Sequence, residues 1–124
     1  EEVQLGMSIG MALEGYVPIT CYPRFDFLVL ALNQLINHAD KIDHLTNNKF
    51  NSKIIIRTII GSNFPLNAGP QHTQDHTLAL KKMVKNIKII KLKNTKNIFK
   101  NYKKCINDKK NKIFLFIEDG NKYI

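Results

Sequence analysis

The stretch "SKIIIRTII", residues 52–60, decides the fold class. It is a nearly continuous run of β-branched side chains without polar alternation, which is typical of a strand that is buried on both faces. Such strands occur in parallel sheets whose two faces are covered by helices. The run therefore predicts a central strand of an α/β domain.

The segments on both sides of this run alternate between helical and strand patterns. Before it we expect a helix over residues 1–15, a short strand in "YVPITCY" (16–22) and a long helix that begins near Asp26. After it we expect a helix from about Asp75 to Met83, the strand "NIKIIKL" (86–92), a helix from about Thr95 to Asp108 and the strand "KIFLFIED" (112–119). This order predicts an α/β fold with a parallel sheet flanked by helices.

The long helix shows a three-and-four spacing that predicts which residues face the core. The spacing selects Phe27, Leu30, Ala31, Gln34, Leu35 and His38.

Length and composition fit one domain of 124 residues, since domains commonly have about 100 to 200 residues. No run approaches the roughly 20 apolar residues that cross a bilayer, and no secretory leader pattern opens the chain. We therefore expect a cytoplasmic protein without a membrane partner. Cys21 and Cys105 lie far apart without metal-site spacing, so we expect buried thiols and no disulfide.

The net charge of +9 raises the question of nucleic-acid binding. Fourteen of the 19 Lys and Arg residues follow residue 80, where they are interleaved with Asn and Ile. This pattern is typical of amphipathic elements whose lysines lie on the solvent-exposed face. Because no nucleic-acid-binding motif accompanies them, we interpret these lysines as a solvated surface.

The loop "LNAGPQHTQDHT", residues 66–77, is the candidate functional segment. It follows the central strand, and in open α/β sheets ligands bind beyond the carboxyl ends of the strands. His72 would lie at this edge. His72 and His76 have the spacing of a metal-binding pair, but no Cys or third His lies at a suitable distance, so we expect no metal site.

Several separated motifs carry a resemblance to a known family. They are the helix from Glu1 to Gly15, "GYVPI" (15–19), "FDFLVLALNQLINHADKI" (25–42), "IIIRTIIG" (54–61) and "GPQHTQ" (69–74). In this order they resemble the pyrimidine-binding domain of thiamine-diphosphate enzymes of the transketolase-like superfamily. The match is with the beta subunit of 2-oxo acid dehydrogenases of the pyruvate and branched-chain type.

The resemblance implies roles for four residues. Glu1 matches the glutamate that activates the cofactor by hydrogen bonding to the aminopyrimidine ring. Phe27 matches an aromatic residue that packs against this ring, and Tyr22 lies near the same pocket. His72 matches the histidine of "Q-H-[ST]-Q", which assists substrate binding and acyl transfer to a lipoyl arm.

The resemblance also implies partners. The family binds the diphosphate and Mg²⁺ through a "G-D-G" segment and a later Asn, and this sequence contains no such motif or Gly-rich loop. We therefore expect an alpha-type subunit to hold the diphosphate and Mg²⁺ of thiamine diphosphate, in a heterotetramer with shared active sites. A small 2-oxo acid would be the substrate, and a lipoyl acyltransferase is a further candidate partner.

The sequence thus predicts one pyrimidine-binding domain over residues 1–124, truncated at its N-terminus and lacking the C-terminal domain of complete beta subunits. The predicted function is cofactor activation in a 2-oxo acid dehydrogenase or decarboxylase that acts with a partner subunit. Two alternatives stay open: a split transketolase-type carboligase, and a non-catalytic basic interaction module.

Overall fold

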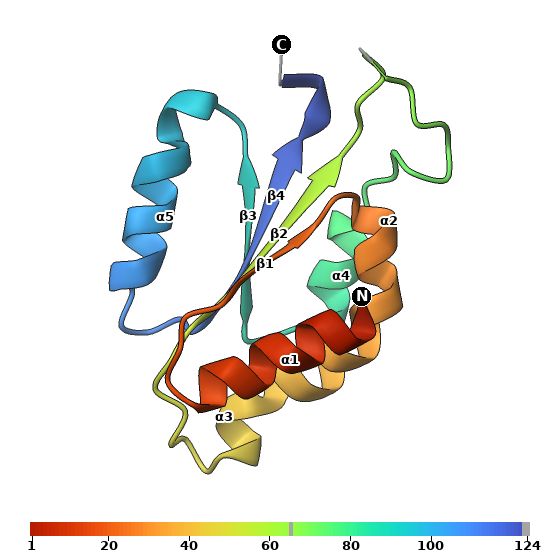
Figure 1. The fold of residues 1–124 in the computed structure, drawn as a ribbon. Helices are drawn as coiled ribbons and strands as arrows, with labels where there is room; N and C mark the ends of the chain where they lie inside the picture. The colour runs from red at the N-terminus through yellow and green to blue at the C-terminus, as the bar shows by residue number, and fades with distance from the viewer. Residues whose placement is uncertain (65, 123–124) are drawn as a thin grey trace.

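The computed structural model describes residues 1–64 and 66–122 and contains a four-stranded sheet in the order β1-β2-β4-β3 (Figure 1). The strands are β1 (Ile19–Tyr22), β2 (Ile54–Ile60), β3 (Ile87–Leu92) and β4 (Ile113–Asp119). All three pairings are parallel. The predicted α/β fold with a parallel sheet is thereby confirmed.

Helices connect the strands, as parallel pairing requires. They are α1 (Glu2–Leu13), α2 (Phe25–Leu28), α3 (Ile42–Leu45), α4 (Thr77–Met83) and α5 (Ile98–Asn107). Between α2 and α3 the helical path continues through 3-10 turns at Val29–Ala31 and Ala39–Lys41 and a π turn at Gln34–His38. Two further 3-10 turns lie at Thr95–Asn97 and Gly120–Lys122.

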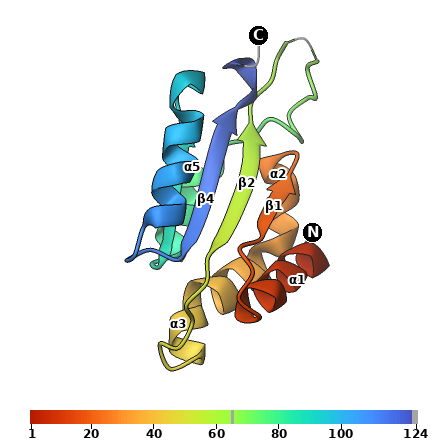
Figure 2. The same cartoon turned by 60° about the vertical axis from the view of Figure 1, so that its left-hand side comes forward.

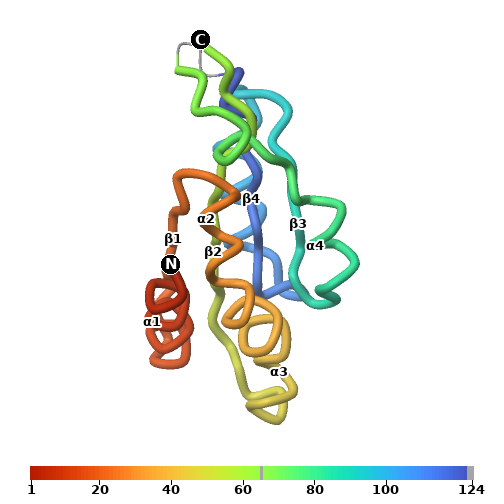
Figure 3. Tube along the Cα trace, turned by 90° about the vertical axis from the view of Figure 1, so that its right-hand side faces the viewer, coloured from red at the N-terminus to blue at the C-terminus, as the bar shows by residue number. Residues whose placement is uncertain are grey.

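The two faces of the sheet are covered unequally. α1, the path from α2 to α3, and α4 lie across one face, where Figure 3 shows them side by side. α5 lies on the other face, as Figure 2 shows, and packs on β3 and β4. There the ring of Tyr102 stacks on Phe116 with 4.3 Å between ring centroids. The run in β2 is buried from both sides, as its β-branched composition predicts.

The predicted core face of the long helix is partly wrong. Ala31 and Leu35 are buried, but Leu30 is 62% exposed and His38 is also exposed. The residues that face the sheet are Phe25, Leu28, Ala31, Leu35, Ala39 and Ile42. The helix begins at Phe25, and its buried row starts there, whereas the predicted row started at Phe27. Phe27 is instead half-buried at the carboxyl edge of the sheet.

The expectation for the cysteines is right for one residue only. Both thiols are free, and Cys105 of α5 is buried against the sheet, but Cys21 is exposed. The physical reason is that β1 is an edge strand, whereas α5 packs on β3 and β4 toward the other edge of the sheet and leaves β1 uncovered. The outward side chains of β1, Cys21 and Ile19, therefore stay in contact with solvent. Within residues 1–64 and 66–122, no helix is long and apolar enough to span a membrane.

Candidate functional site

Glu1 and Tyr22 meet where β1 ends. Tyr22 is 1% exposed, and its hydroxyl donates a hydrogen bond to the main-chain oxygen of Glu1 over 3.0 Å. Burial raises the pKa of Tyr22 to about 12, so the phenol remains a donor at neutral pH. The side chain of Glu1 stays exposed at the beginning of α1. The buried tyrosine thus fixes the backbone that carries this carboxyl group.

Phe27 and His72 form a second contact at the same edge. Their ring centroids lie 5.2 Å apart with an interplanar angle of 43°, and both residues are half-buried. Nδ1 of His72 is buried and has no hydrogen-bond partner among the described residues. An imidazole nitrogen that is removed from water and unpaired is unfavourable unless a polar group binds to it. His72 therefore has the character of a binding residue.

The connection from β2 to α4 returns toward the start of α2 (Figure 1), and it brings His72 into contact with Phe27. Its two ends meet where the amide of Gly61 donates to the carbonyl of Thr73 over 3.2 Å. Gly61 has a φ of +69°, and a Cβ at this position would lie 2.6 Å from Nδ2 of Asn121. Only glycine fits this conformation and this space without strain. Arg24 donates from Nη1 to the carbonyl of Gly61 and joins the loop to the residue before α2.

Asp26 connects the same loop to α2. Its Oδ1 accepts a hydrogen bond from Nε2 of Gln74 over 2.8 Å and lies 3.2 Å from Nε2 of His76. The ring of His76 also contacts Phe25 edge to face at 5.5 Å. The sequence interpretation missed these three polar residues. The available signal was a charged residue between two phenylalanines and the polar positions two and four after His72.

His72 and His76 contact different residues in this arrangement. His72 contacts Phe27, whereas His76 contacts Phe25 and Asp26. Over residues 1–64 and 66–122, no group of three or more His, Cys, Asp and Glu side chains could hold a metal ion.

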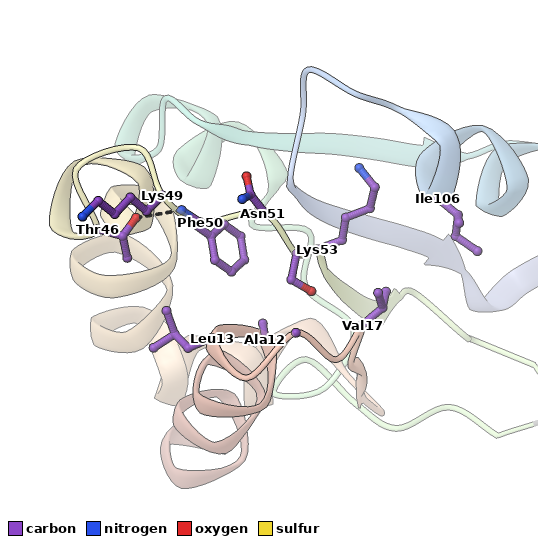
Figure 4. A pocket seen from close by; sticks show the side chains of 11 residues that line it. Ala12, Leu13, Val17, Thr46, Lys49, Phe50, Asn51, Lys53 and Ile106 are labelled. Atoms are coloured by element: carbon purple, nitrogen blue, oxygen red, sulfur yellow. Dashed lines mark hydrogen bonds between the residues drawn. The ribbon is translucent and has the colours of Figure 1, made fainter.

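A separate pocket of about 490 Å³ lies at the opposite end of the sheet (Figure 4). It is formed by the end of α1, the segment that leads into β2, and Ile106 of α5. Its lining includes none of the four residues that the resemblance singles out. We therefore assign the candidate site to the carboxyl edge of the strands, where Glu1, Tyr22, Phe27 and His72 lie.

Two curated proteins are similar to the chain. It is 31% identical over 74 residues to the beta subunit of acetoin:2,6-dichlorophenolindophenol oxidoreductase from Cupriavidus necator, covering 60% of the chain and 21% of that protein. It is 36% identical over 61 residues to the beta subunit of 2-oxoisovalerate dehydrogenase from Bacillus subtilis, covering 49% of the chain and 19% of that protein.

The matched segment thus spans about a fifth of the length of each relative. No family model matches the chain. Both relatives carry the name of a beta subunit, and one is named as a 2-oxo acid dehydrogenase. The comparisons therefore confirm the resemblance that the motifs indicate, since the chain is similar in sequence to the beta subunits of an acetoin oxidoreductase and of a 2-oxoisovalerate dehydrogenase.

Proposed function

We propose that this chain supplies the cofactor-activating part of a beta-type subunit in a thiamine-diphosphate-dependent 2-oxo acid dehydrogenase or decarboxylase. The observation that carries the proposal is the contact between His72 and Phe27, whose ring centroids lie 5.2 Å apart. Residues 45 positions apart in sequence, both singled out by the resemblance, meet at the edge of the sheet where α/β proteins bind ligands.

The described residues fit the pyrimidine half of the cofactor. Phe27 is only half-buried and offers part of its ring for stacking on an aromatic ring. Glu1 offers an exposed carboxyl group on a main chain that the buried Tyr22 holds by a hydrogen bond. His72 offers a buried nitrogen without a partner among the described residues. An aromatic surface, an acid and an imidazole at one edge match the chemistry that the resemblance implies.

Each residue would then have a definite task. Thiamine diphosphate, when bound, supplies the electron sink for decarboxylation. Glu1 would hydrogen-bond a pyrimidine nitrogen and thereby control where a proton resides on that ring. Phe27 would orient the ring by packing against it. His72 would orient the carboxylate of the 2-oxo acid or move a proton, a role suited to a group that titrates near neutral pH.

The proposal requires a second subunit, because the sequence has no motif for the diphosphate or Mg²⁺. α1 offers a surface for such a partner. Val3, Met7 and Met11 follow one another every four residues and are 74%, 64% and 46% exposed. Among the described residues, no atom outside the adjoining helix turns lies within 4 Å of the place that a Cβ at Gly10 would occupy. Exposed apolar stripes of this kind mark interaction surfaces.

We assign this stripe to contact with the alpha-type subunit or a second beta subunit in the heterotetramer. A lipoyl acyltransferase as acyl acceptor, a 2-oxo acid as substrate, a cytoplasmic location and a single pyrimidine-binding domain over residues 1–124 remain predictions of the same proposal.

Isothermal titration of thiamine diphosphate with Mg²⁺ tests the proposal. The titration uses the full-length protein with and without the alpha-type subunit. We expect thiamine diphosphate to bind only when both subunits are present. In an activity assay of this complex, Glu1→Gln should cause a severe loss of turnover, because the amide cannot exchange a proton with the pyrimidine ring. Glu14→Gln, at the exposed far end of α1, is the matched control. Binding by neither preparation, or full turnover with Glu1→Gln, would contradict the proposed function.

A further inference from the structure

Four consecutive residues at the start of α2 contact the loop that carries His72. Arg24 donates to the carbonyl of Gly61. Phe25 packs against His76, and Phe27 packs against His72. Between these two rings, Asp26 accepts from Gln74 and His76. Asp26 is the acid in this series, and it binds two loop residues at once.

Among the described residues, no hydrogen bond holds the side chain of His72 in place. Its Nδ1 has no partner among the described residues, and its amide bonds to the carbonyl of Gly69 within the same loop. The position of the imidazole therefore depends on where the loop backbone lies. Gln74 and His76 follow His72 by two and four residues, so their attachment to Asp26 fixes the backbone directly after His72.

Asp26 is suited to this task by burial and charge. Its side chain is 11% exposed, and hydrogen bonds to a charged acceptor in a sheltered place are stronger than neutral ones. The neighbouring acid on the loop, Asp75, has other partners. It accepts a hydrogen bond from the amide of Thr77 and pairs with Lys91 over 2.6 Å. Asp75 thus holds the start of α4, while Asp26 holds the loop against α2.

We infer that Asp26 is a positioning residue that holds His72 against Phe27 through Gln74 and His76. The catalytic consequence rests on the proposed function of His72, but the structural consequence does not. Without the carboxylate, Gln74 and His76 lose their shared acceptor, and we expect His72 to move from its position at 5.2 Å from the ring of Phe27.

Histidine NMR of the full-length protein tests the structural part without cofactor or partner. In the unaltered protein, the ring current of Phe27 shifts the imidazole protons of His72, and Phe27→Leu defines the shift when the ring is absent. We expect Asp26→Ala to move the His72 signals in the same direction as Phe27→Leu. Asp26→Asn, which keeps one acceptor oxygen, should move them less. The matched control is Asp43→Ala. Asp43 lies in α3, at the end of the same helical path, and pairs with Lys112, away from the loop that carries His72.

Turnover of the complex with its alpha-type subunit tests the catalytic part. If His72 orients the substrate, Asp26→Ala should lower kcat/KM by about tenfold or more, with partial rescue in Asp26→Asn and no change in Asp43→Ala. Unchanged His72 signals in a folded Asp26→Ala protein would overturn the inference, whatever the turnover. Shifted signals with unchanged turnover would leave the positioning role intact and count against the proposed role of His72.

Discussion

The hydroxyl of Tyr22 donates a hydrogen bond to the main-chain oxygen of Glu1, which lies 21 residues earlier in the sequence. This bond joins the end of β1 to the beginning of α1. It also places the residue that the resemblance identifies as the cofactor-activating acid next to the carboxyl edge of the sheet.

Replacing Tyr22 with Phe should destabilise the fold by about 1 kcal/mol, because the hydrogen bond from the buried hydroxyl to the carbonyl of Glu1 is lost. Tyr16→Phe is the matched control, since Tyr16 is 63% exposed and its substitution should change the unfolding free energy by less than about 0.5 kcal/mol. Denaturant titrations of both variants measure the difference. Equal midpoints would show that the bond to Glu1 contributes nothing to stability.

Asp40 should contribute more stability than any acid in an exposed ion pair. It is 1% exposed, and Oδ1 accepts from the amides of Lys85 and Asn86 over 2.8 and 2.7 Å. Burial alone would raise the pKa of Asp40, but the hydrogen bonds from Lys41, Asn86 and Lys85 outweigh it and lower the pKa. We expect Asp40→Ala to cost about 1 to 3 kcal/mol, because the amides of Lys85 and Asn86 lose their shared acceptor. Asp43→Ala, at a half-exposed pair, should cost less than about 1 kcal/mol.

The lowered pKa of Asp40 also predicts a pH dependence. A carboxyl group whose pKa is lower in the folded state stabilises the protein fully above its ordinary value of 3.8. This contribution is lost as the pH falls through the lowered value. Unfolding free energies measured between pH 6 and the acid limit should therefore fall less steeply for Asp40→Ala than for the unaltered protein. Parallel curves would contradict this assignment.

Much of the fold could be predicted from the sequence, because the signals are local. The β-branched run of β2 and the order of strands and helices follow from hydrophobic periodicity, which depends on neighbouring residues. The buried face of the long helix was harder to predict. A row of buried residues that starts at Phe25 lies on a different side of the helix from a row that starts at Phe27. His38 and Leu30 were assigned to the core for this reason and are exposed.

The candidate site was predictable only where a motif existed. His72 and Phe27 were identified through the resemblance, and the structure brings them into contact. The attachment of Gln74 and His76 to Asp26 depends on how a loop folds back onto a helix about 50 residues earlier. Nothing in the local sequence specifies that pairing. The exposure of Cys21 likewise depends on which part of the sheet α5 covers.

The two thiols should differ strongly in reactivity. Cys21 is exposed on β1, whereas Cys105 of α5 is 2% exposed against the sheet, where burial raises its pKa to about 11. Since the thiolate is the reactive form, an aromatic disulfide reagent at pH 8 should modify one thiol rapidly and the other only as the protein opens. Cys21→Ser should abolish the rapid phase, and Cys105→Ser should retain it. Two equal rates would show that the packing of α5 on the sheet does not protect Cys105.

The adjacent residues Phe27 and Leu28 should separate ligand binding from folding. Leu28 is 0% exposed in the core, so Leu28→Ala should destabilise the protein by about 2 to 5 kcal/mol. Phe27 is half-buried against His72, so Phe27→Ala should cost clearly less stability. If its ring packs on the pyrimidine, however, Phe27→Ala should weaken thiamine diphosphate binding by about tenfold, because stacking contributes about 0.5 to 1.5 kcal/mol beyond the buried area.

Calorimetric titration of the two-subunit complex and denaturant unfolding of the chain measure the two effects separately. At a temperature where Leu28→Ala remains folded, its cofactor affinity should match that of the unaltered complex. A Phe27→Ala variant that loses stability as Leu28→Ala does, while binding the cofactor normally, would assign Phe27 to the core. Its contact with His72 would then serve the packing of the loop and not the recognition of the pyrimidine.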